Sequence, residues 1–535
     1  MDEDTTSSEK MKRDSDIKME IVLDIIKGLC HADSKVKEFV ELCNSITPLT
    51  PLEITVLSGG LTNYSYKIHV ADKAVFAKLA FNYALWNPDW DGKYDVVRTE
   101  NEALMMSKFH TLSPDNVAVP LHICDVTHPS MPSSEMKLLV TTWASNDEQL
   151  SNQFIDGHAD TRVASSLALA LAKLHQEPFD PAFNDGVRGV YLNIVEQTLD
   201  KMKELEEGGR KEGLPRTTAY IDVLPDSPVA LYEIAKENYG KREALVHSDV
   251  HGFNVLVEHK PSLAELSTFG PTGTFTLCDW EMCYAGPIGR DLGIMAAFPL
   301  ACALSHAISG HPDASYDVTN FVEIFWSTYV AARAKTEGPT RACEMYRNAI
   351  GWTGMFLSFY VLADIHLEFL PLSTTSRDFE IVQDSLGILT LNLLRLGFSE
   401  CTTGSTLPEL KAAFAAAVDE QVMFVQQTEQ GRRPSRTRRS SRLRESGVRV
   451  SDTNMQVPQS RTLRGKVMAV VAMKRIEKGI KGMFVKDVGE KEEGGKEEDA
   501  RKDGGGEKGK KEDEKEMQTS RGRNGATTKR FFTSF

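Results

Sequence analysis

The chain has 535 residues, which is enough for two or more lobes with substantial hydrophobic cores. Its composition, 41% hydrophobic and 26% charged residues, is typical of a soluble globular protein. The net charge is −14, and residues 431–535, with 28 Lys and Arg against 16 Asp and Glu, leave −26 for the first 430 residues. Because binding to a phosphate backbone needs a basic surface, this acidic body argues against nucleic acid as the main partner.

Neither the N-terminus nor the apolar segments indicate export or membrane insertion. The first twenty residues are rich in charge and contain no apolar run, so no secretory signal is visible. The longest apolar stretches, Leu292–Ile308 and Ala349–Leu362, are short for a membrane span and contain polar residues, so we predict buried helices and no transmembrane segment. The eight cysteines are scattered without a C-x-x-C pair, which favours free thiols, a reducing compartment and a cytoplasmic location.

The first part of the chain predicts a strand-rich lobe. A flexible charged N-terminus, residues 1–20, leads into a helical pattern from Met19 to Ile46. The pattern then alternates with a period of two, which is typical of strands. The predicted elements of residues 50–143 are strands Glu53–Leu57, Tyr64–Val70 and Ala74–Leu79, a helix Asp95–Phe109, and strands Val117–Cys124 and Lys137–Thr142. Residues 21–143 therefore form the N-terminal helix and first lobe.

The second part, residues 144–400, is mainly helical. Its predicted helices are Val163–His175, Leu292–Ile308, Val318–Lys335, Thr340–Leu362 and Phe379–Leu396, with short strands at Asn254–Val257 and Thr274–Cys278. A C-terminal helix occupies residues 401–430. Residues 431–535 are Arg/Ser-rich and then Gly/Lys/Glu-rich, so we predict a disordered charged tail. Its basic clusters either recruit a kinase, a membrane or an import factor, or are simply solvated.

One segment of the helical lobe carries the pattern H-x-D-x-x-x-x-N, from His247 to Asn254. Phosphoryl transfer to an alcohol needs a carboxylate that orients the hydroxyl and accepts its proton, and oxygen ligands for Mg²⁺. Asp249 suits the first role and Asn254 the second, while His247 would support the loop. The alternative is a polar turn between a helix and a strand.

A second segment strengthens the chemical interpretation. Asp279 and Glu281 follow an apolar strand, 25 residues or more after Asn254. Asp279 is placed to ligate Mg²⁺, and Glu281 to share the metal or position the substrate; otherwise they form the acidic edge of a hairpin. Asp291, ten residues after Glu281, is predicted to cap the next helix, to tie down the backbone of the catalytic loop, or to do both.

The first lobe contains a candidate nucleotide site. Gly59 and Gly60 between two strands allow the backbone to approach phosphates, and Asn63 adds an amide. Lys78 lies on the returning strand among apolar neighbours, so it needs a buried charged partner.

Glu100 on the following helix is the preferred partner of Lys78 and Glu102 is the reserve, because positions i and i+2 face different sides of a helix. Thr142 and Trp143, at the junction of the lobes, are the residues where adenine is expected to bind.

In this order and spacing, these residues resemble the aminoglycoside phosphotransferase and choline kinase superfamily. The resemblance covers roughly residues 20–400 and rests on Gly59-Gly60-Leu61-Thr62-Asn63, Lys78, Glu100, His247-x-Asp249-x4-Asn254, Asp279-x-Glu281 and Gly289-Arg290-Asp291-Leu292-Gly293. It implies an α+β, bilobal protein-kinase-like fold with a strand-rich ATP-binding lobe and a mainly helical catalytic lobe. It also implies ATP and Mg²⁺ as cofactors, Asp249 as base, Asn254 and Asp279 as metal ligands, and Lys78 on the ATP phosphates.

The resemblance leaves the acceptor open. Residues 59–63 and 279–281 are similar to choline and ethanolamine kinases, whereas residues 284–289 and 351–354 look more like methylthioribose kinase. Phe359 and Tyr360 stand where the latter carries an arginine pair for its substrate. The aromatic residues of this helix, Trp352, Phe356, Phe359 and Tyr360, either line a cation–π site for an amine or pack in the core.

Three classes of function compete. The first is a small-molecule alcohol kinase. The second is a nucleotide-binding pseudokinase whose tail recruits partners, although the catalytic set is complete. The third, a protein kinase, is disfavoured because the short segment between Asp279 and Arg290 leaves no room for a protein-substrate platform. The oligomeric state does not follow from the sequence.

Overall fold

The computed structural model describes residues 52–57, 63–70, 73–82, 95–127, 135–144, 146, 148–208, 214–258, 273–363, 367–399 and 402–432. These residues all fall in one unit of the chain. The predicted flexible N-terminus and N-terminal helix, the glycines Gly59 and Gly60, and the charged tail beyond Arg432 lie outside the described residues.

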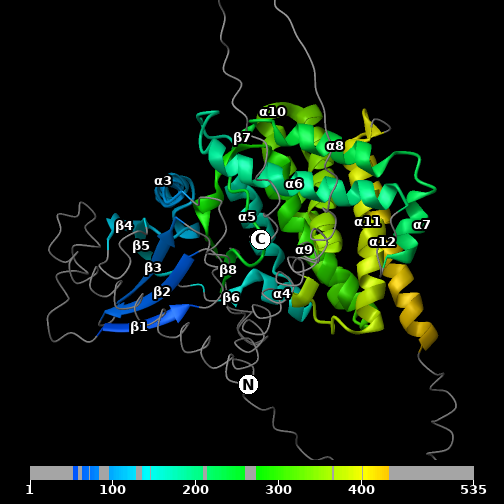
Figure 1. The fold of residues 1–535 in the computed structure, drawn as a ribbon, viewed down its shortest axis with the longest axis horizontal. Coiled ribbons are helices and arrows are strands. Elements are labelled where there is room, and N and C mark those ends of the chain that lie inside the picture. Colours follow the sequence, from blue (N-terminus) through cyan, green and yellow to red (C-terminus); the bar gives the residue numbers. More distant parts are fainter. Residues whose placement is uncertain are drawn as a thin grey trace, which may run out of the picture. The chain divides into compact units, whose positions relative to one another are not determined.

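A five-stranded antiparallel sheet forms the first lobe (Figure 1). Its strands are β1 (Leu52–Leu57), β2 (Asn63–Val70), β3 (Lys73–Phe81), β4 (Pro120–Val126) and β5 (Met136–Thr142), in the order β1-β2-β3-β5-β4. Tyr66 and Ile68, on the face predicted from the alternation, are 0% exposed. Apolar burial on one face of β2 therefore sets the register of the strand.

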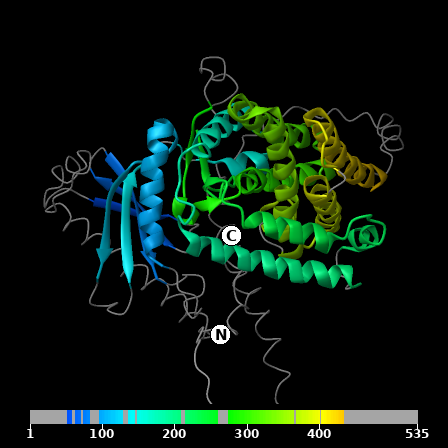
Figure 2. The same cartoon turned by 90° about the horizontal axis from the view of Figure 1, so that it is seen from above.

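One helix, α3 (Val97–Leu112), lies along the sheet (Figure 2), and the 3-10 turn η1 (Pro114–Asn116) follows it. Met105, Met106 and Phe109 of α3 are buried. Because these positions recur at helical spacing, α3 presents a continuous apolar side to the rest of the lobe. The same spacing places Arg98 and Glu102 one turn apart on a buried side of the helix.

The second lobe is mainly helical, as expected. Its elements are β6 (Glu148–Gln149), α4 (Leu150–Asp156), α5 (Thr161–Leu174), α6 (Asp185–Glu206), α7 (Pro215–Ile221), α8 (Pro228–Tyr239), β7 (Ala244–Val246), β8 (Val255–Val257), β9 (Phe275–Leu277), the 3-10 turn η2 (Trp280–Met282), β10 (Tyr284–Gly286), α9 (Ile288–Ile308), α10 (Pro312–Ala363), the 3-10 turn η3 (Leu367–Phe369), α11 (Arg377–Phe398) and α12 (Leu407–Arg432). Two small antiparallel sheets, β10-β7 and β6-β8-β9, frame the segments with predicted chemistry. The predicted fold class, with a strand-rich first lobe and a helical second lobe, is confirmed.

Helix α9 is the centre of this second lobe. Every residue from Ile288 to Ile308 is buried, and α10, α11 and α12 pack around it. Among the described residues it is the one helix long and apolar enough to cross a membrane by length and composition, and that stretch is 100% buried inside the fold. This agrees with the prediction of a buried helix for Leu292–Ile308.

The two predicted helices Val318–Lys335 and Thr340–Leu362 are the two halves of α10. Gly338 breaks the helix with a φ of 85°, in the left-handed region that suits glycine, and Pro339 follows. The helix is therefore interrupted at Gly338 and continues from Pro339, in agreement with the two separate helices predicted from the sequence.

Two glycines of α9 allow α10 to approach closely. A Cβ atom on Gly289 would lie 2.3 Å from the indole of Trp352, and one on Gly293 would lie 2.6 Å from the backbone carbon of Trp352 and 2.7 Å from the backbone nitrogen of Thr353. Real Cβ atoms do not approach other atoms this closely, so the contact requires glycine at both positions. The packing of α9 on α10 thus explains both glycines of the segment 289–293.

We predict that Gly293→Ala lowers the free energy of unfolding by about 1–3 kcal/mol, because the methyl group meets backbone atoms that cannot move aside. Gly186→Ala on α6 is the matched control: nothing lies within 4 Å of its Cβ position. Since alanine favours helix over glycine by about 0.5–1 kcal/mol, the control should be neutral or stabilising. Denaturant unfolding of both variants measures the difference, and equal stabilities would contradict this account of the helix contact.

Candidate active site

The candidate catalytic loop, residues 247–254, joins β7 to β8 and is held by one buried carboxylate. Asp291, in the first turn of α9, accepts hydrogen bonds from the backbone N–H groups of His247 (2.8 Å) and Ser248 (2.6 Å). The N-cap position of α9 belongs to Pro287. Of the two roles predicted for Asp291, the helix cap is therefore wrong and the tie to the loop backbone is confirmed.

Ser248 is the strained residue of this loop. Its φ of 69° lies in the left-handed region, which costs a residue with a side chain about 1–2 kcal/mol. Three hydrogen bonds hold it there: its N–H donates to Asp291, its carbonyl accepts from Arg290 Nε (2.9 Å), and its hydroxyl donates to the carbonyl of Met282. The turn at Ser248 therefore fixes the direction of the Asp249 side chain, which follows it in the loop.

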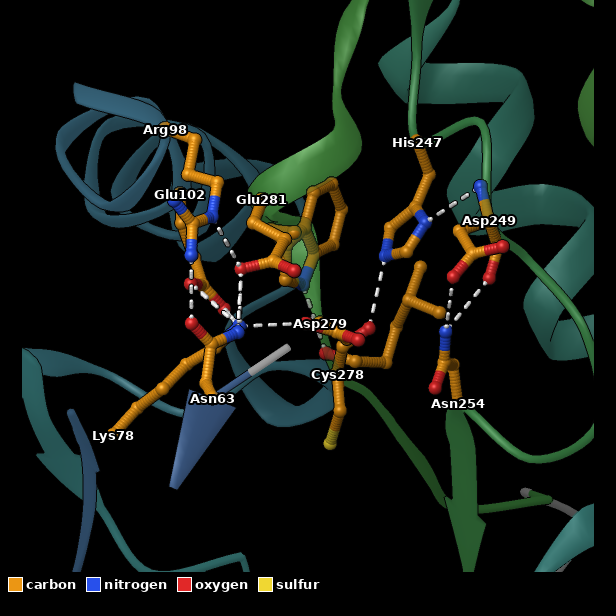
Figure 3. Close-up of polar contacts among 12 residues, drawn as sticks. Asn63, Lys78, Arg98, Glu102, His247, Asp249, Asn254, Cys278, Asp279 and Glu281 are labelled. Carbon is orange, nitrogen blue, oxygen red and sulfur yellow. Dashed lines mark hydrogen bonds and ion pairs between the residues drawn. The ribbon is translucent and has the colours of Figure 1, made fainter. Parts of the chain in front are cut away.

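Asp249 has one carboxylate oxygen that is hydrogen-bonded and one that has no hydrogen-bond partner among the described residues. Its Oδ2 accepts from the amide of Asn254 (2.9 Å; Figure 3). The same oxygen lies 3.4 Å from His251 Nε2. The buried Oδ1 has no hydrogen-bond partner within the described part of the chain. Burial alone would raise the pKa of Asp249, but His251 and Arg290 outweigh it and hold that pKa below its usual value. The carboxylate is therefore ionised at neutral pH and can accept a hydrogen bond at Oδ1.

His247 supports the loop from inside, as predicted. Its Nε2 lies 3.0 Å from the carbonyl oxygen of Cys278, its Nδ1 accepts from the backbone N–H of Asp249 (3.3 Å), and its ring packs 4.5 Å from that of Trp280. Burial lowers the pKa of His247, so the ring is neutral. With Nδ1 accepting, the single proton sits on Nε2 and is donated to Cys278.

The ammonium group of Lys78 lies between three carboxylates (Figure 3). Its Nζ is 2.6 Å from Asp279, 2.9 Å from Glu102 and 3.1 Å from Glu281. Burial would lower the pKa of Lys78, but the three carboxylates raise it well above its usual value, so the lysine stays charged. The predicted need of Lys78 for a buried charged partner is met by residues from both lobes.

The preferred partner in the sequence analysis was the wrong glutamate. Glu102, not Glu100, pairs with Lys78, and both Glu102 oxygens accept from it. Glu100 instead contacts Lys137 on β5, with its own side chain 52% exposed. The rotation of α3 decides between them, because it turns Arg98 and Glu102 inward and leaves Glu100 half-exposed against Lys137.

Asn63 and Glu281 belong to a buried network beside Lys78. Asn63 Nδ2 donates to Glu281 Oε2 (2.8 Å), and Arg98 donates to both Asn63 Oδ1 (3.0 Å) and Glu281 (3.3 Å). Burial would raise the pKa of Glu281, yet Lys78 and Arg98 outweigh it and lower that pKa to about 2. Burial and the neighbouring carboxylates raise the pKa of Glu102 to about 7.

This network changes the interpretation of the predicted metal ligands. Ligand atoms of Glu102, Asp279 and Glu281 lie within 4.8 Å of one another, a spacing that suits a cation. The ammonium of Lys78 already fills that place. Asp279, with its side chain 39% exposed, keeps an accessible carboxylate, whereas the side chain of Glu281 is 3% exposed. Carboxylate and amide oxygens suit Mg²⁺, so Asp279 and Asn254 fit the ion better than Glu281 does.

At the predicted adenine site, the backbone N–H of Thr142 is already hydrogen-bonded within the protein. Thr142 exchanges two hydrogen bonds with Val119: its N–H donates to the carbonyl (2.9 Å), and its hydroxyl accepts from the N–H (2.9 Å). Trp143 is partly exposed, and Lys67 Nζ lies 4.0 Å from its ring centroid. Of the two predicted residues, Trp143 is the better placed for adenine, which stays a prediction.

The aromatic residues of α10 pack in the core. Trp352, Phe356, Phe359 and Tyr360 are all buried. The guanidinium of Arg290 lies 5.2 Å from the ring of Phe356 and 5.6 Å from that of Tyr239. An internal cation therefore already occupies the face of Phe356, and the core-packing alternative is confirmed for this helix.

Three functional residues were missed or underrated in the sequence: Arg98, His251 and Arg290. Arg98 had a usable signal, since it precedes Glu102 by one helical turn. His251 lies only two residues after Asp249, but its contact with that carboxylate depends on the conformation of the loop, which the spacing does not indicate. Arg290 reaches the carbonyl of Ser248 through tertiary packing, 42 residues along the chain.

Comparison with known proteins now adds the family. Residues 53–316 match the sequence model of the phosphotransferase enzyme family, APH. This segment is a phosphotransferase domain of that family. The predicted resemblance to the aminoglycoside phosphotransferase and choline kinase superfamily is confirmed, and with it the kinase class of the domain. A search of curated proteins finds no match to the chain.

Solved structures similar to the chain include other phosphotransferases. Spectinomycin phosphotransferase APH(9)-Ia, in complex with ADP and spectinomycin, is 13% identical, with 74% of this chain and 99% of that chain covered and a TM-score of 0.30. An ethanolamine kinase from Plasmodium vivax is 13% identical, with 71% and 86% covered and a TM-score of 0.32. A putative fructosamine-3-kinase from Haemophilus somnus 129PT is 12% identical, with 65% and 95% covered and a TM-score of 0.33. The family assignment rests on the sequence match and not on these scores.

The two glutamates of α3 provide a matched pair of variants in this phosphotransferase domain. Glu102→Gln removes a charge-assisted hydrogen bond to Lys78, so we expect kcat/KM for ATP to fall about tenfold to a hundredfold. Glu100→Gln, two residues away, removes only a half-exposed pair with Lys137 and should leave kcat/KM within about twofold. Steady-state kinetics with ATP as the varied substrate measures both, and the opposite ranking would restore Glu100 as the functional partner.

Proposed function

We propose that the protein transfers the γ-phosphoryl group of ATP to a hydroxyl group of a small molecule. The observation that carries the proposal is Asp249, a buried and ionised carboxylate whose Oδ1 is available in a fixed loop. A hydroxyl that donates to Oδ1 would be oriented for attack and could pass its proton to the carboxylate. A strong base is not needed, because little proton transfer precedes the loose transition state of phosphoryl transfer.

The nucleotide side is proposed around Lys78. In a complex with ATP, the ammonium group that now faces Asp279 would interact with phosphate oxygens, while Glu102 keeps it in place. Asn254 and Asp279 would hold Mg²⁺, which neutralises phosphate charge when bound. Asn254 suits this because its amide nitrogen is committed to Asp249, which leaves its oxygen for the ion.

A small acceptor is favoured over a protein because the segment after Asp279 is short and buried. It consists of η2, β10 and Pro287, and it leads directly into α9. All residues from Trp280 to Asp291 are buried, so this part of the chain offers no platform for a peptide.

The acceptor itself is proposed to be an alcohol that touches an aromatic cluster beside the catalytic loop. Phe253 is partly exposed and packs 4.9 Å from Phe298 and 5.1 Å from Phe369. With Phe356 engaged by Arg290, these rings are the better candidates to contact a substrate cation. Choline, ethanolamine and methylthioribose are the acceptors to examine first.

The test is an ATP-consumption screen of the full chain against these acceptors, homoserine and aminoglycosides. Asp249→Asn should reduce turnover with the accepted substrate by about 10²–10⁴-fold, the usual contribution of a positioned base. Asp222→Asn, an exposed aspartate at the end of α7, is the control and should keep full activity.

The alternative function is a nucleotide-binding pseudokinase. Binding of ATP without turnover of any acceptor, with equal behaviour of Asp249→Asn and the unaltered chain, would favour it and overturn the proposal.

A further inference from the structure

A polar hollow of about 310 Å³ lies in the helical lobe between the end of α8, the second half of α10 and the end of α11. Its walls carry Lys241, Arg341 and Arg347, the amide side chain of Asn348, and a single carboxylate, Glu344. The volume is at the lower end of the range for small-molecule sites. None of these residues belongs to the catalytic loop or to the network around Lys78.

Two of the three cations lack a carboxylate. Lys241 has no side-chain hydrogen bond or ion pair with any residue in the described part of the chain, and Arg347 donates only to the hydroxyl of Thr403 (3.1 Å). Lys241 and Arg347 therefore bring two positive charges without carboxylate partners to the hollow, in a protein whose net charge is −14. Like charges gathered in one hollow repel each other, and an anion between them would relieve that repulsion.

The third cation, Arg341, is paired with carboxylates that an anion in the hollow can replace. It contacts Glu243 (3.0 Å) and Glu344 (3.1 Å), with its side chain 34% exposed. Ion pairs this exposed contribute little net stability, so an oxyanion that offers bidentate acceptance could recruit the guanidinium at small cost. The guanidinium groups of Arg341 and Arg347 with the ammonium of Lys241 match the donors that phosphate groups prefer.

Arg341 also starts a line of polar contacts towards the interior. It lies 3.8 Å from Glu337, and Glu337 pairs with Arg333 one turn earlier on α10. Arg333, which is buried, donates to the hydroxyl of Tyr329 (3.0 Å). The break at Gly338 lies within this line, between the residues of the first half of α10 and Arg341.

The line ends at the carboxylate that holds the catalytic loop. Tyr329 Oη lies 2.8 Å from His175 Nδ1, and His175 Nε2 lies 3.1 Å from Asp291 Oδ2. Because Asp291 can only accept, His175 carries a proton on Nε2, and a neutral ring then accepts at Nδ1 from Tyr329. The same Oδ2 accepts from the backbone of His247.

A second, shorter route joins the hollow to the start of α9. Glu243, the partner of Arg341, accepts with its other oxygen from the backbone N–H of Ile288 (3.1 Å), the first residue of that helix. Movement of Arg341 towards an anion would therefore alter contacts at the turn of α9 that contains Asp291.

We propose that this hollow binds a small phosphate-bearing anion and that its occupancy is transmitted through Arg341 to Asp291 and the catalytic loop. The binding part stands independently of the enzymatic activity. The regulatory part rests on the proposed phosphotransferase function, since it is measured as a change in turnover.

Binding is tested by calorimetric titration of inorganic phosphate and of glycerol phosphate into the full chain, saturated with a non-hydrolysable ATP analogue so that the nucleotide site is closed. Lys241→Ala and Arg347→Ala should each weaken binding about tenfold, and the double variant should abolish it. Lys335→Ala, another exposed lysine on α10, is the matched control and should bind normally. Tighter binding of glycerol phosphate would identify an organic monoester as the ligand class, and tighter inorganic phosphate the free ion.

Two outcomes would overturn the proposed binding site. The first is that neither anion binds at a concentration of about 10 mM, and the second is that the double variant binds as tightly as the unaltered chain.

Transmission is tested by initial rates at fixed free Mg²⁺ with and without the better-binding anion. In the unaltered chain the anion should change kcat or KM about fivefold or more. The double variant should keep its basal rate and lose the response. Tyr329→Phe removes the hydroxyl that links Arg333 to His175 and lies outside the hollow. This variant should bind the anion normally, but its rate should no longer change when the anion is added. A normal response in Tyr329→Phe, or binding without any response in the unaltered chain, would refute the transmission; a lack of all turnover would instead bear on the proposed function alone.

Discussion

The structure of the candidate active site depends on the buried carboxylate of Asp291. Its oxygens accept two backbone N–H groups of the catalytic loop and the ring of His175, so one side chain satisfies three donors from two other segments of the chain. A backbone N–H buried without a partner costs about 1–3 kcal/mol, and the left-handed turn at Ser248 adds strain. The loop therefore keeps its catalytic conformation only because α9 begins where it does, and the close contact of Gly293 with α10 fixes that helix.

The second constraint is charge balance around Lys78. Three carboxylates and two cations meet in a buried network, where an unpaired charge would be strongly unfavourable. Two carboxylates, Asp279 and Glu281, come from the helical lobe, while Lys78, Glu102 and Arg98 come from the first lobe. The network thus joins the lobes at the point where phosphates are expected, and only Asp279 keeps substantial exposure.

The sequence predicted the features that are local and failed where tertiary packing decides. Asp249, Asn254 and Asp279 lie next to short strands, and their spacing was enough to group them. The choice between Glu100 and Glu102 depended on the rotation of α3 about its axis, which two-residue spacing cannot fix. The aromatic residues of α10 were ambiguous for a related reason: an amphipathic pattern does not tell whether a ring faces a ligand or, as for Phe356, the guanidinium of Arg290. Most strands of the first lobe and the long helices from α9 onwards followed from periodicity. Helices α4, α6, α7 and α8 were not predicted, and β6, β7 and β10 are too short to show a period.

The position of Asp291 behind the catalytic loop explains why the proposed regulation would not need to change the residues that contact the substrate. Asp249 and the proposed metal ligands Asn254 and Asp279 lie near strand ends, whereas the backbone of the loop that carries Asp249 is held by Asp291. In the proposed transmission, a change at Asp291 would act on the backbone of His247 and Ser248, next to Asp249, without adding charge to the reaction site. Since phosphoryl transfer depends on alignment more than on covalent participation by the protein, small displacements of this loop are sufficient to change the rate. Regulation that shifts the catalytic loop would therefore act on the alignment of the reacting groups, to which phosphoryl transfer is most sensitive.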